Sequence, residues 1–245
     1  MAIDKDRADH RSVDRRSRSP AIVRKMIEIS CRGLLFDLDG VLVDSTRAVA
    51  RVWAKWAVAH GFDPAEIVHR AHGRPSIATI RDLLPNADHE AENKVVLQGE
   101  IDDTAGVVAL PGARELLNSL PRGRWAVVTS CSRPLAEVRL KTAGFPYPPK
   151  VVTSDDVLRG KPDPEPYLKG AALLEVPPSE CVVFEDAPAG IRAGKAAGAM
   201  VVALRTTVSD GELETAGADW ILPGYDHLVA LSDDHGSDAI RLQLS

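Results

Sequence analysis

The chain has 245 residues, of which 44% are hydrophobic and 27% charged, fractions that exclude a fibrous or wholly disordered protein. It carries 30 Lys and Arg against 35 Asp and Glu, a net charge of -5, so no overall positive field favours a nucleic-acid partner. No apolar run approaches about 18 residues, and no secretory signal begins the chain, so we expect a cytoplasmic protein without a membrane partner. Three widely spaced cysteines predict neither disulfides nor a zinc site.

Residues 1–29 are dense in Asp, Arg, Lys and Ser and show no sustained hydrophobic period, which predicts a disordered arm of mixed charge. We assign no chemistry to this arm. Met26 directly precedes the first strand-like segment, and we hypothesise that translation begins there.

From residue 30 onward, short apolar runs alternate with segments of helical period, a pattern typical of repeated βαβ units. The predicted strands are Gly33–Phe36, Trp125–Thr129, Lys150–Thr153, Cys181–Phe184 and Ala199–Leu204. The predicted helices between them include Leu135–Ala143, Tyr167–Leu174 and Ala189–Ala197. Strands that are apolar on both faces belong to a parallel sheet with helices on each side, so we predict an α/β fold of the doubly wound type.

The segment 45–110 interrupts this pattern, because its sequence predicts helices and contains no convincing strand. Its first helix, capped by Ser45 or Thr46, presents an apolar stripe that includes Trp53 and Trp56, which we assign to packing. We therefore predict an inserted all-α domain at 45–110, with 30–44 and 111–245 forming the core.

Carboxylates follow two of the predicted strands. Asp37 and Asp39 end the first strand, two residues apart and so on the same side of an extended backbone, and Glu185 and Asp186 end the fourth. In an open parallel sheet these strand ends meet at the edge where ligands bind. At an effective dielectric of about 20, like charges about 4 Å apart repel by about 4 kcal/mol, so the cluster predicts a hard cation, Mg²⁺, among its oxygens. Taken singly, each pair could instead cap a turn or a helix.

Groups suited to a phosphate follow two other strand ends. Thr129 and Ser130 offer hydroxyl and backbone N–H groups at a strand-to-helix turn, although such residues also cap ordinary helices. Lys161 lies in a loop stiffened by alternate prolines. Together with the carboxylates, these groups predict phosphoryl transfer: Asp37 attacks phosphorus, while Lys161 and Mg²⁺ offset the repulsion between two anions. Asp39 is then the general acid and base.

The segments DLDGVLVDS, VVTS, RGKPDPEPY and VVFEDAPAGIRAGKAAG, in this order, resemble the four motifs of the haloacid dehalogenase-like hydrolases over about residues 33–204. The resemblance implies a Rossmann-like core with a helical cap inserted after the first motif. It also implies Asp37 as nucleophile, Asp39 as acid and base, and Ser130 and Lys161 on the phosphate. Mg²⁺ would lie on Asp37, the Asp39 carbonyl and Asp186, with Glu185 a further ligand in some relatives.

The cap segment is similar to that of sugar-phosphate and polyol-phosphate phosphatases, including the 2-deoxyglucose-6-phosphate and glycerol phosphatase group. This similarity implies a small phosphorylated metabolite as the partner, and we infer no protein partner. His72 and Arg74 are candidate substrate contacts in the cap, and they are equally well read as a turn residue and a solvated cation. β-Phosphoglucomutases usually have a histidine where this chain has Val49 and an arginine where it has Ser76, which favours a phosphatase. A mutase, a phosphoglycolate phosphatase and a non-catalytic phosphate-binding regulator remain the alternatives.

Overall fold

The computed structural model describes residues 26–71, 74–232 and 239–245, so most of the predicted arm and His72 lie outside the described residues. Its centre is a six-stranded parallel sheet, with strand order β6-β5-β2-β7-β8-β9. In that order, the strands are Val151–Val152, Trp125–Val128, Gly33–Phe36, Cys181–Glu185, Met200–Leu204 and Trp220–Leu222. The predicted α/β fold is thus confirmed, and β9 is a strand that sequence analysis did not identify.

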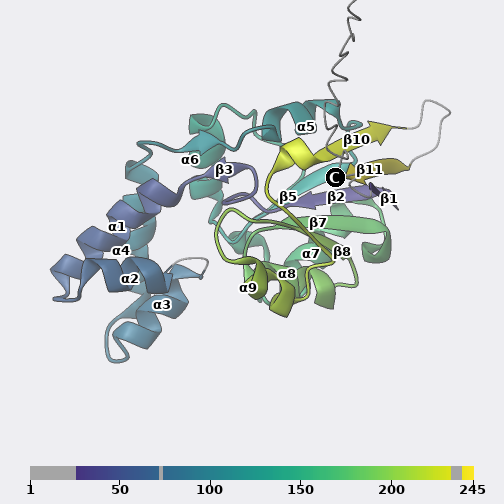
Figure 1. The fold of residues 1–245 in the computed structure, drawn as a ribbon. Helices are drawn as coiled ribbons and strands as arrows, with labels where there is room; N and C mark the ends of the chain where they lie inside the picture. The colour runs from purple at the N-terminus through teal and green to yellow at the C-terminus, as the bar shows by residue number, and fades with distance from the viewer. Residues whose placement is uncertain (1–25, 72–73, 233–238) are drawn as a thin grey trace, which may run out of the picture.

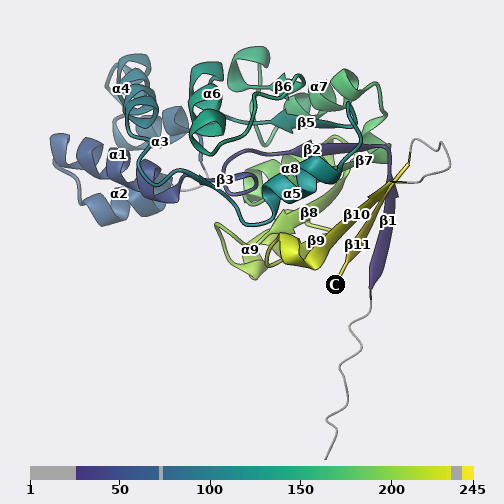
Figure 2. The same cartoon turned by 90° about the horizontal axis from the view of Figure 1, so that it is seen from above.

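Each face of this sheet packs on a separate apolar cluster. Helices α7 (Glu165–Leu174), α8 (Pro188–Ala196) and α9 (Asp210–Ala216) cover one face, where Leu35 and Val183 are fully buried. Helices α5 (Ala113–Ser119) and α6 (Arg133–Thr142) lie on the other face, above the sheet in Figure 1 and on the viewer's side of it in Figure 2. There, the rings of Phe36 and Phe184 stack at 4.7 Å. Burial of both faces explains why these strands are apolar throughout.

A second, antiparallel sheet closes the face covered by α5 and α6. It has the order β1-β11-β10, with strands Ile27–Cys31, Ile240–Leu244 and Leu228–Ser232. Strand β1 begins inside the segment that we predicted to be a disordered arm, which is a correction for residues 27–29. The alternation of exposed and buried residues along β1, with Ile29 and Cys31 facing the core, accounts for this pairing.

Four helices form the cap, lying to one side of the sheet in Figure 1. They are α1 (Thr46–Ala59), α2 (Pro64–Ala71), α3 (Ser76–Leu83) and α4 (His89–Asp102). Trp53 and Trp56 are buried in their shared core, as predicted, with Ile67, Ile80 and Val96. The cap contacts the rest of the molecule where α4 packs on α6.

Two short strands mark where the chain enters and leaves the cap. Strand β3 (Val43–Asp44) pairs antiparallel with β4 (Val108–Ala109). Strand β4 lies inside 45–110, where we predicted no strand, and its two residues are too few to give a detectable alternation in sequence. Short 3-10 turns occupy Ser154–Asp156, Pro178–Glu180 and Tyr225–His227.

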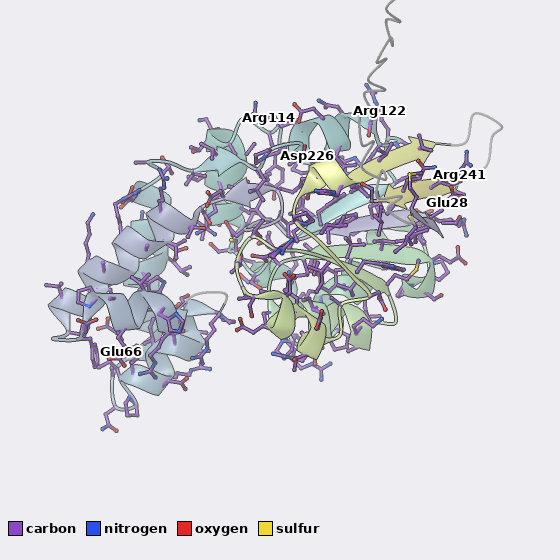
Figure 3. All side chains as sticks on the ribbon, in the orientation of Figure 1. Glu28, Glu66, Arg114, Arg122, Asp226 and Arg241 are labelled. Carbon is purple, nitrogen blue, oxygen red and sulfur yellow. The ribbon has the colours of Figure 1, made fainter. Side chains whose placement is uncertain are left out.

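Charged side chains are spread over both parts of the molecule, for example Glu66 on α2 and Asp226 ahead of β10 (Figure 3). Among the described residues, no helix is long and apolar enough to cross a membrane.

Candidate active site

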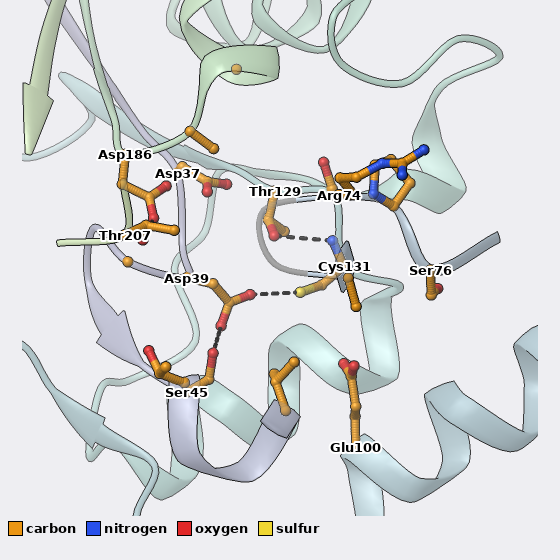
Figure 4. A pocket seen from close by; sticks show the side chains of 18 of the residues that line it. Asp37, Asp39, Ser45, Arg74, Ser76, Glu100, Thr129, Cys131, Asp186 and Thr207 are labelled. Carbon is orange, nitrogen blue, oxygen red and sulfur yellow. Dashed lines mark hydrogen bonds between the residues drawn. The ribbon is translucent and has the colours of Figure 1, made fainter. Parts of the chain in front are cut away.

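A cavity of about 210 Å³ lies between the carboxyl edge of the large sheet and the cap helices (Figure 4). Seven residues predicted for the site line it from the core: Asp37, Asp39, Thr129, Ser130, Lys161, Glu185 and Asp186. The cap side includes the apolar residues Val49, Trp53, Val68 and Leu97. Three strand ends and one loop therefore bring the four sequence motifs to one place.

Lys161 is at the centre of the core side of the cavity. Its Nζ lies 2.9 Å from Asp37 Oδ1 and 2.6 Å from Glu185 Oε1, and it donates to the Val128 carbonyl at 3.0 Å. The side chain is only 6% exposed. Burial alone would lower the pKa of Lys161, but Asp37 and Glu185 raise it above its ordinary value. The ammonium group is therefore a fixed positive charge beside Asp37.

Glu185 is held by contacts on both of its oxygens. Oε1 accepts from the Tyr167 hydroxyl at 2.6 Å as well as from Lys161. Oε2 accepts the backbone N–H groups of Asp186 and Ala187 at 3.1 and 3.3 Å. Gly190 in α8 makes room for this carboxylate, since a Cβ there would lie 1.7 Å from Oε1. With its oxygens occupied in this way, Glu185 holds Lys161 in place.

Asp37, Glu185 and Asp186 form an acidic cluster, in which one carboxylate oxygen from each lies within 4.8 Å of the others. Burial raises the pKa of Asp37 to about 7, against the opposing effect of Lys161. Burial, and the charges of Glu185 and Asp37, raise the pKa of Asp186 well above its usual range. Three buried carboxylates at this spacing are a donor set suited to a hard cation.

The loop after β8 completes the surroundings of Asp186. The Thr207 hydroxyl donates to Asp186 Oδ2 (Figure 4), and both side chains lie next to Gly40. Gly40 has φ +73°, and a Cβ there would lie 1.8 Å from Asp186 Oδ2. The glycine of the first motif is thus required both by its backbone conformation and by the approach of Asp186.

Asp39 is separate from the acidic cluster, and its side chain is 28% exposed at the cavity. Its Oδ1 accepts from the Ser45 hydroxyl at 2.7 Å, and its Oδ2 accepts from the Cys131 thiol at 3.0 Å and from Arg139 (Figure 4). Ser45 precedes α1 as predicted, but its side chain does not cap the helix. The hydroxyl instead contacts Asp39, which is a better acceptor because it is charged.

Thr129 and Ser130 follow β5 as predicted, and the two side chains differ in their setting. Thr129 is buried and its Oγ1 accepts from the Cys131 backbone N–H at 3.1 Å, while Ser130 is exposed in the cavity. In the cap, Arg74 lines the cavity and forms an ion pair with Asp82 at 2.7 Å. It is therefore close enough to be a substrate contact, although its guanidinium already has a partner.

Sequence analysis missed several residues of this site, namely Glu100, Cys131, Arg139, Tyr167 and Thr207. Cys131 is buried, and its thiol contacts Asp39. One signal for Arg139 was present, because it falls on the buried stripe of α6 with Leu135, Ala136 and Leu140. A charged residue in an apolar stripe indicates a buried partner.

Comparison with known proteins agrees with this geometry. The chain matches the model of the haloacid dehalogenase-like hydrolases over residues 31–198. It is 42% identical to hexitol phosphatase A of Escherichia coli, covering 86% of this chain and 99% of that one. It is 39% identical to 2-deoxyglucose-6-phosphate phosphatase 1 of Saccharomyces cerevisiae, covering 89% and 97%. A solved structure of a putative beta-phosphoglucomutase from Bacteroides vulgatus superposes with a TM-score of 0.65 at 31% identity, covering 78% and 83%.

Proposed function

The chain belongs to the haloacid dehalogenase-like hydrolase family, and we propose that it is a Mg²⁺-dependent phosphatase of a small sugar or polyol phosphate. The observation that carries this proposal is the contact between Lys161 and Asp37 at the acidic end of β2. A carboxylate beside a fixed cation is suited to attack a phosphate, which carries negative charge itself.

We propose Asp37 as the nucleophile. Lys161 holds Oδ1, and Oδ2 has no hydrogen-bond partner among the described residues, so Oδ2 is the oxygen free to form a bond to phosphorus. Lys161 also places positive charge where the phosphoryl oxygens would lie, and the Ser130 hydroxyl faces the same cavity. The product of this first step is a phosphorylated Asp37 and an alcohol.

The acidic cluster fits the metal that the family resemblance implies. Its donors are the oxygens of three carboxylates that are buried close together. The pKa values of Asp37 and Asp186 are raised because Lys161 offsets only part of the negative charge of the cluster and of the cost of burying it. Asp37 and Asp186 would hold Mg²⁺, with Glu185 behind them fixing Lys161. When bound, the cation offsets the charge of the cluster and of the phosphate.

We propose Asp39 as general acid and base. It protonates the leaving oxygen as the P–O bond breaks, and then, as a carboxylate, takes the proton of the water that hydrolyses the phosphorylated Asp37. Its exposure at the cavity permits both roles, and it lies outside the acidic cluster that would hold the cation.

The size and lining of the cavity support a small substrate. Its volume of about 210 Å³ is below the range of about 300–1,000 Å³ typical of drug-sized ligands. We propose that residues 45–110 form a cap domain over a core of 30–44 and 111–245, and that Arg74 lies near the substrate. The names of the relatives, a hexitol phosphatase and a deoxyhexose-phosphate phosphatase, support a sugar or polyol phosphate.

The test is phosphate release from a panel of hexitol, hexose, glycerol and glycolate phosphates, with Mg²⁺ or EDTA. We expect turnover only with Mg²⁺, and a loss on the order of 10⁴-fold or more in Asp37→Asn, because the nucleophile is removed. Turnover that persists in Asp37→Asn would overturn the mechanism.

The same panel separates the alternatives. The structural similarity to a putative beta-phosphoglucomutase makes a mutase the second candidate. Glucose 1-phosphate with a bisphosphate activator would reveal it, by isomerisation rather than phosphate release. Preference for glycolate phosphate would identify a phosphoglycolate phosphatase. Thermal stabilisation by a phosphate ester without turnover would identify a binding protein.

A further inference from the structure

Arg139 is a buried cation in contact with both the core and the cap. It lies on core helix α6, and its side chain is 6% exposed. Nη1 donates to Asp39 Oδ2 and lies 3.0 Å from the Cys131 sulfur, while Nη2 donates to Glu100 Oε2 of cap helix α4 at 2.7 Å. Arg139 and Glu100 both line the cavity. One guanidinium group thus joins the proposed acid and base to a carboxylate of the cap.

Stability alone is a poor explanation for this cluster. Removing charges from water is expensive, and replacing a buried ion pair with apolar residues of similar volume is often neutral or stabilising. Burial indeed raises the pKa of Glu100 despite its contact with Arg139. Leu97 and Leu135 line the same cavity and pack in the apolar core, so apolar side chains already occupy this part of the molecule.

The contacts on Asp39 define what Arg139 can do. Ser45 reaches one carboxylate oxygen, and Arg139 and Cys131 reach the other, so the plane of the carboxyl group is fixed from two sides. Among these partners, Arg139 alone is charged, and within the described residues it alone also contacts a carboxylate of the cap, Glu100. Its planar group can hold two carboxylates at once, which a lysine does less well.

We propose that Arg139 is a positioning residue for Asp39, and that Glu100 of the cap fixes Arg139 in turn. The inference rests on the proposed phosphatase function. In the first step, the proton of Asp39 passes to the leaving oxygen as the P–O bond breaks and the bond to Asp37 forms. Arg139 keeps the carboxyl group at the cavity for this transfer and pairs with the carboxylate that remains.

This role predicts a dependence on the leaving group. An alkyl phosphate such as glycerol 1-phosphate needs a proton on its leaving oxygen, whereas p-nitrophenyl phosphate releases a stable phenolate without one. The ratio kcat/KM includes the steps up to and including departure of this group, so it is independent of the later hydrolysis of Asp37. A general structural defect would lower kcat/KM for both esters alike.

The experiment measures kcat/KM of both esters for the full chain and for Arg139→Met. We expect a loss about 10-fold to 100-fold greater for the alkyl than for the aryl ester, because misplacing a general acid removes part of its contribution. Arg139→Lys should recover part of this difference. Glu100→Gln should show a smaller difference in the same direction, and Asp39→Asn the largest.

Arg133→Met is the matched control. Arg133 lies on the same helix and contacts both oxygens of Asp156 at 2.8 and 2.7 Å, but it does not line the cavity. We expect its two kcat/KM values to keep the wild-type ratio. A change of that ratio in Arg133→Met as large as in Arg139→Met would contradict the inference.

Removal of Arg139 alone leaves two carboxylates without their cation, which is expected to lower stability. The double variant Arg139→Met/Glu100→Met removes the buried charge of the cap as well, and its folding is checked by circular dichroism. Equal losses for the two esters in the folded variants would overturn the inference and leave the proposed function standing. Absence of wild-type turnover with p-nitrophenyl phosphate and with every alkyl phosphate of the panel above would overturn the proposed function and the inference with it.

Discussion

The two walls of the cavity differ in their chemistry. On the core wall, the ammonium group of Lys161 lies between the carboxylates of Asp37 and Glu185, so this wall is highly charged. On the cap wall, Val49, Trp53 and Leu97 are apolar. The core thus offers groups that act on any phosphate ester, and the cap offers a surface that the alcohol part of a substrate would contact. This difference predicts that core substitutions lower all activities together, whereas cap substitutions change the ranking of substrates.

The largest effect is expected from the core wall. In Gly190→Ala, the new Cβ would lie 1.7 Å from Glu185 Oε1, so this carboxylate must move away from Lys161. We expect kcat/KM to fall about 10-fold to 100-fold for every substrate, because Lys161 loses its alignment with Asp37. Gly211→Ala in α9 is the control, since nothing lies within 4 Å of a Cβ there. Loss for one substrate class alone would show that Glu185 does not act through Lys161.

A change on the cap wall should have a smaller and more selective effect. Leu97→Ala removes an apolar side chain from the cap wall and so enlarges the cavity. We expect the ratio of kcat/KM between a hexitol phosphate and glycerol 1-phosphate to change by about 10-fold, in favour of the larger substrate. Leu173→Ala is the control, because Leu173 is exposed on α7 and does not line the cavity. An unchanged ratio of kcat/KM would show that Leu97 does not influence which substrate is preferred.

The smallest expected effect is a pH dependence of stability, which is caused by the acidic cluster. Burial raises the pKa of Asp37 to about 7, so without a cation the folded protein keeps a proton that the unfolded chain releases. Its stability should therefore fall as pH rises from about 4 to about 7. A cation binds the carboxylate form, so Mg²⁺ should raise Tm more at about pH 8 than at about pH 5. This explanation would be contradicted if Mg²⁺ raised Tm equally at the two pH values. It would also be contradicted if the stability of Asp37→Asn depended on pH in the same way as that of the wild type.

Much of the core site could be predicted from sequence because its residues follow strands directly. Asp37 follows β2 and Asp186 follows β7, and parallel neighbours bring their ends together. Strand β9 and the antiparallel strands β10 and β11 were not predicted. The segments of β9 and β10 give no clear period, whereas β11 (Ile240–Leu244) does alternate apolar and polar residues, a signal that was present in the sequence and was not used. Sequence patterns report local periodicity, and these strands depend on partners far along the chain.

The contacts around Asp39 could not be predicted for a related reason. Arg139 is 100 residues from Asp39 and 39 from Glu100, so its role depends on how α4 packs on α6. The contact made by the Ser45 side chain could not be predicted from the sequence either. Its position before α1 correctly indicated a helix start, but the nearby charged acceptor determined where its hydroxyl points.

The pairing of β3 with β4 has an evolutionary consequence. Val43 and Asp44 lie opposite Ala109 and Val108, and the Leu110 N–H donates to the Leu42 carbonyl at 2.9 Å, so the chain departs from the core and returns to it at adjacent points. These contacts are made by the backbone and require no particular side chains. Recombination could replace everything between β3 and β4 with a segment of another length while leaving the catalytic strands in register. New substrate preferences could thus arise by exchange of a whole module as well as by point mutation.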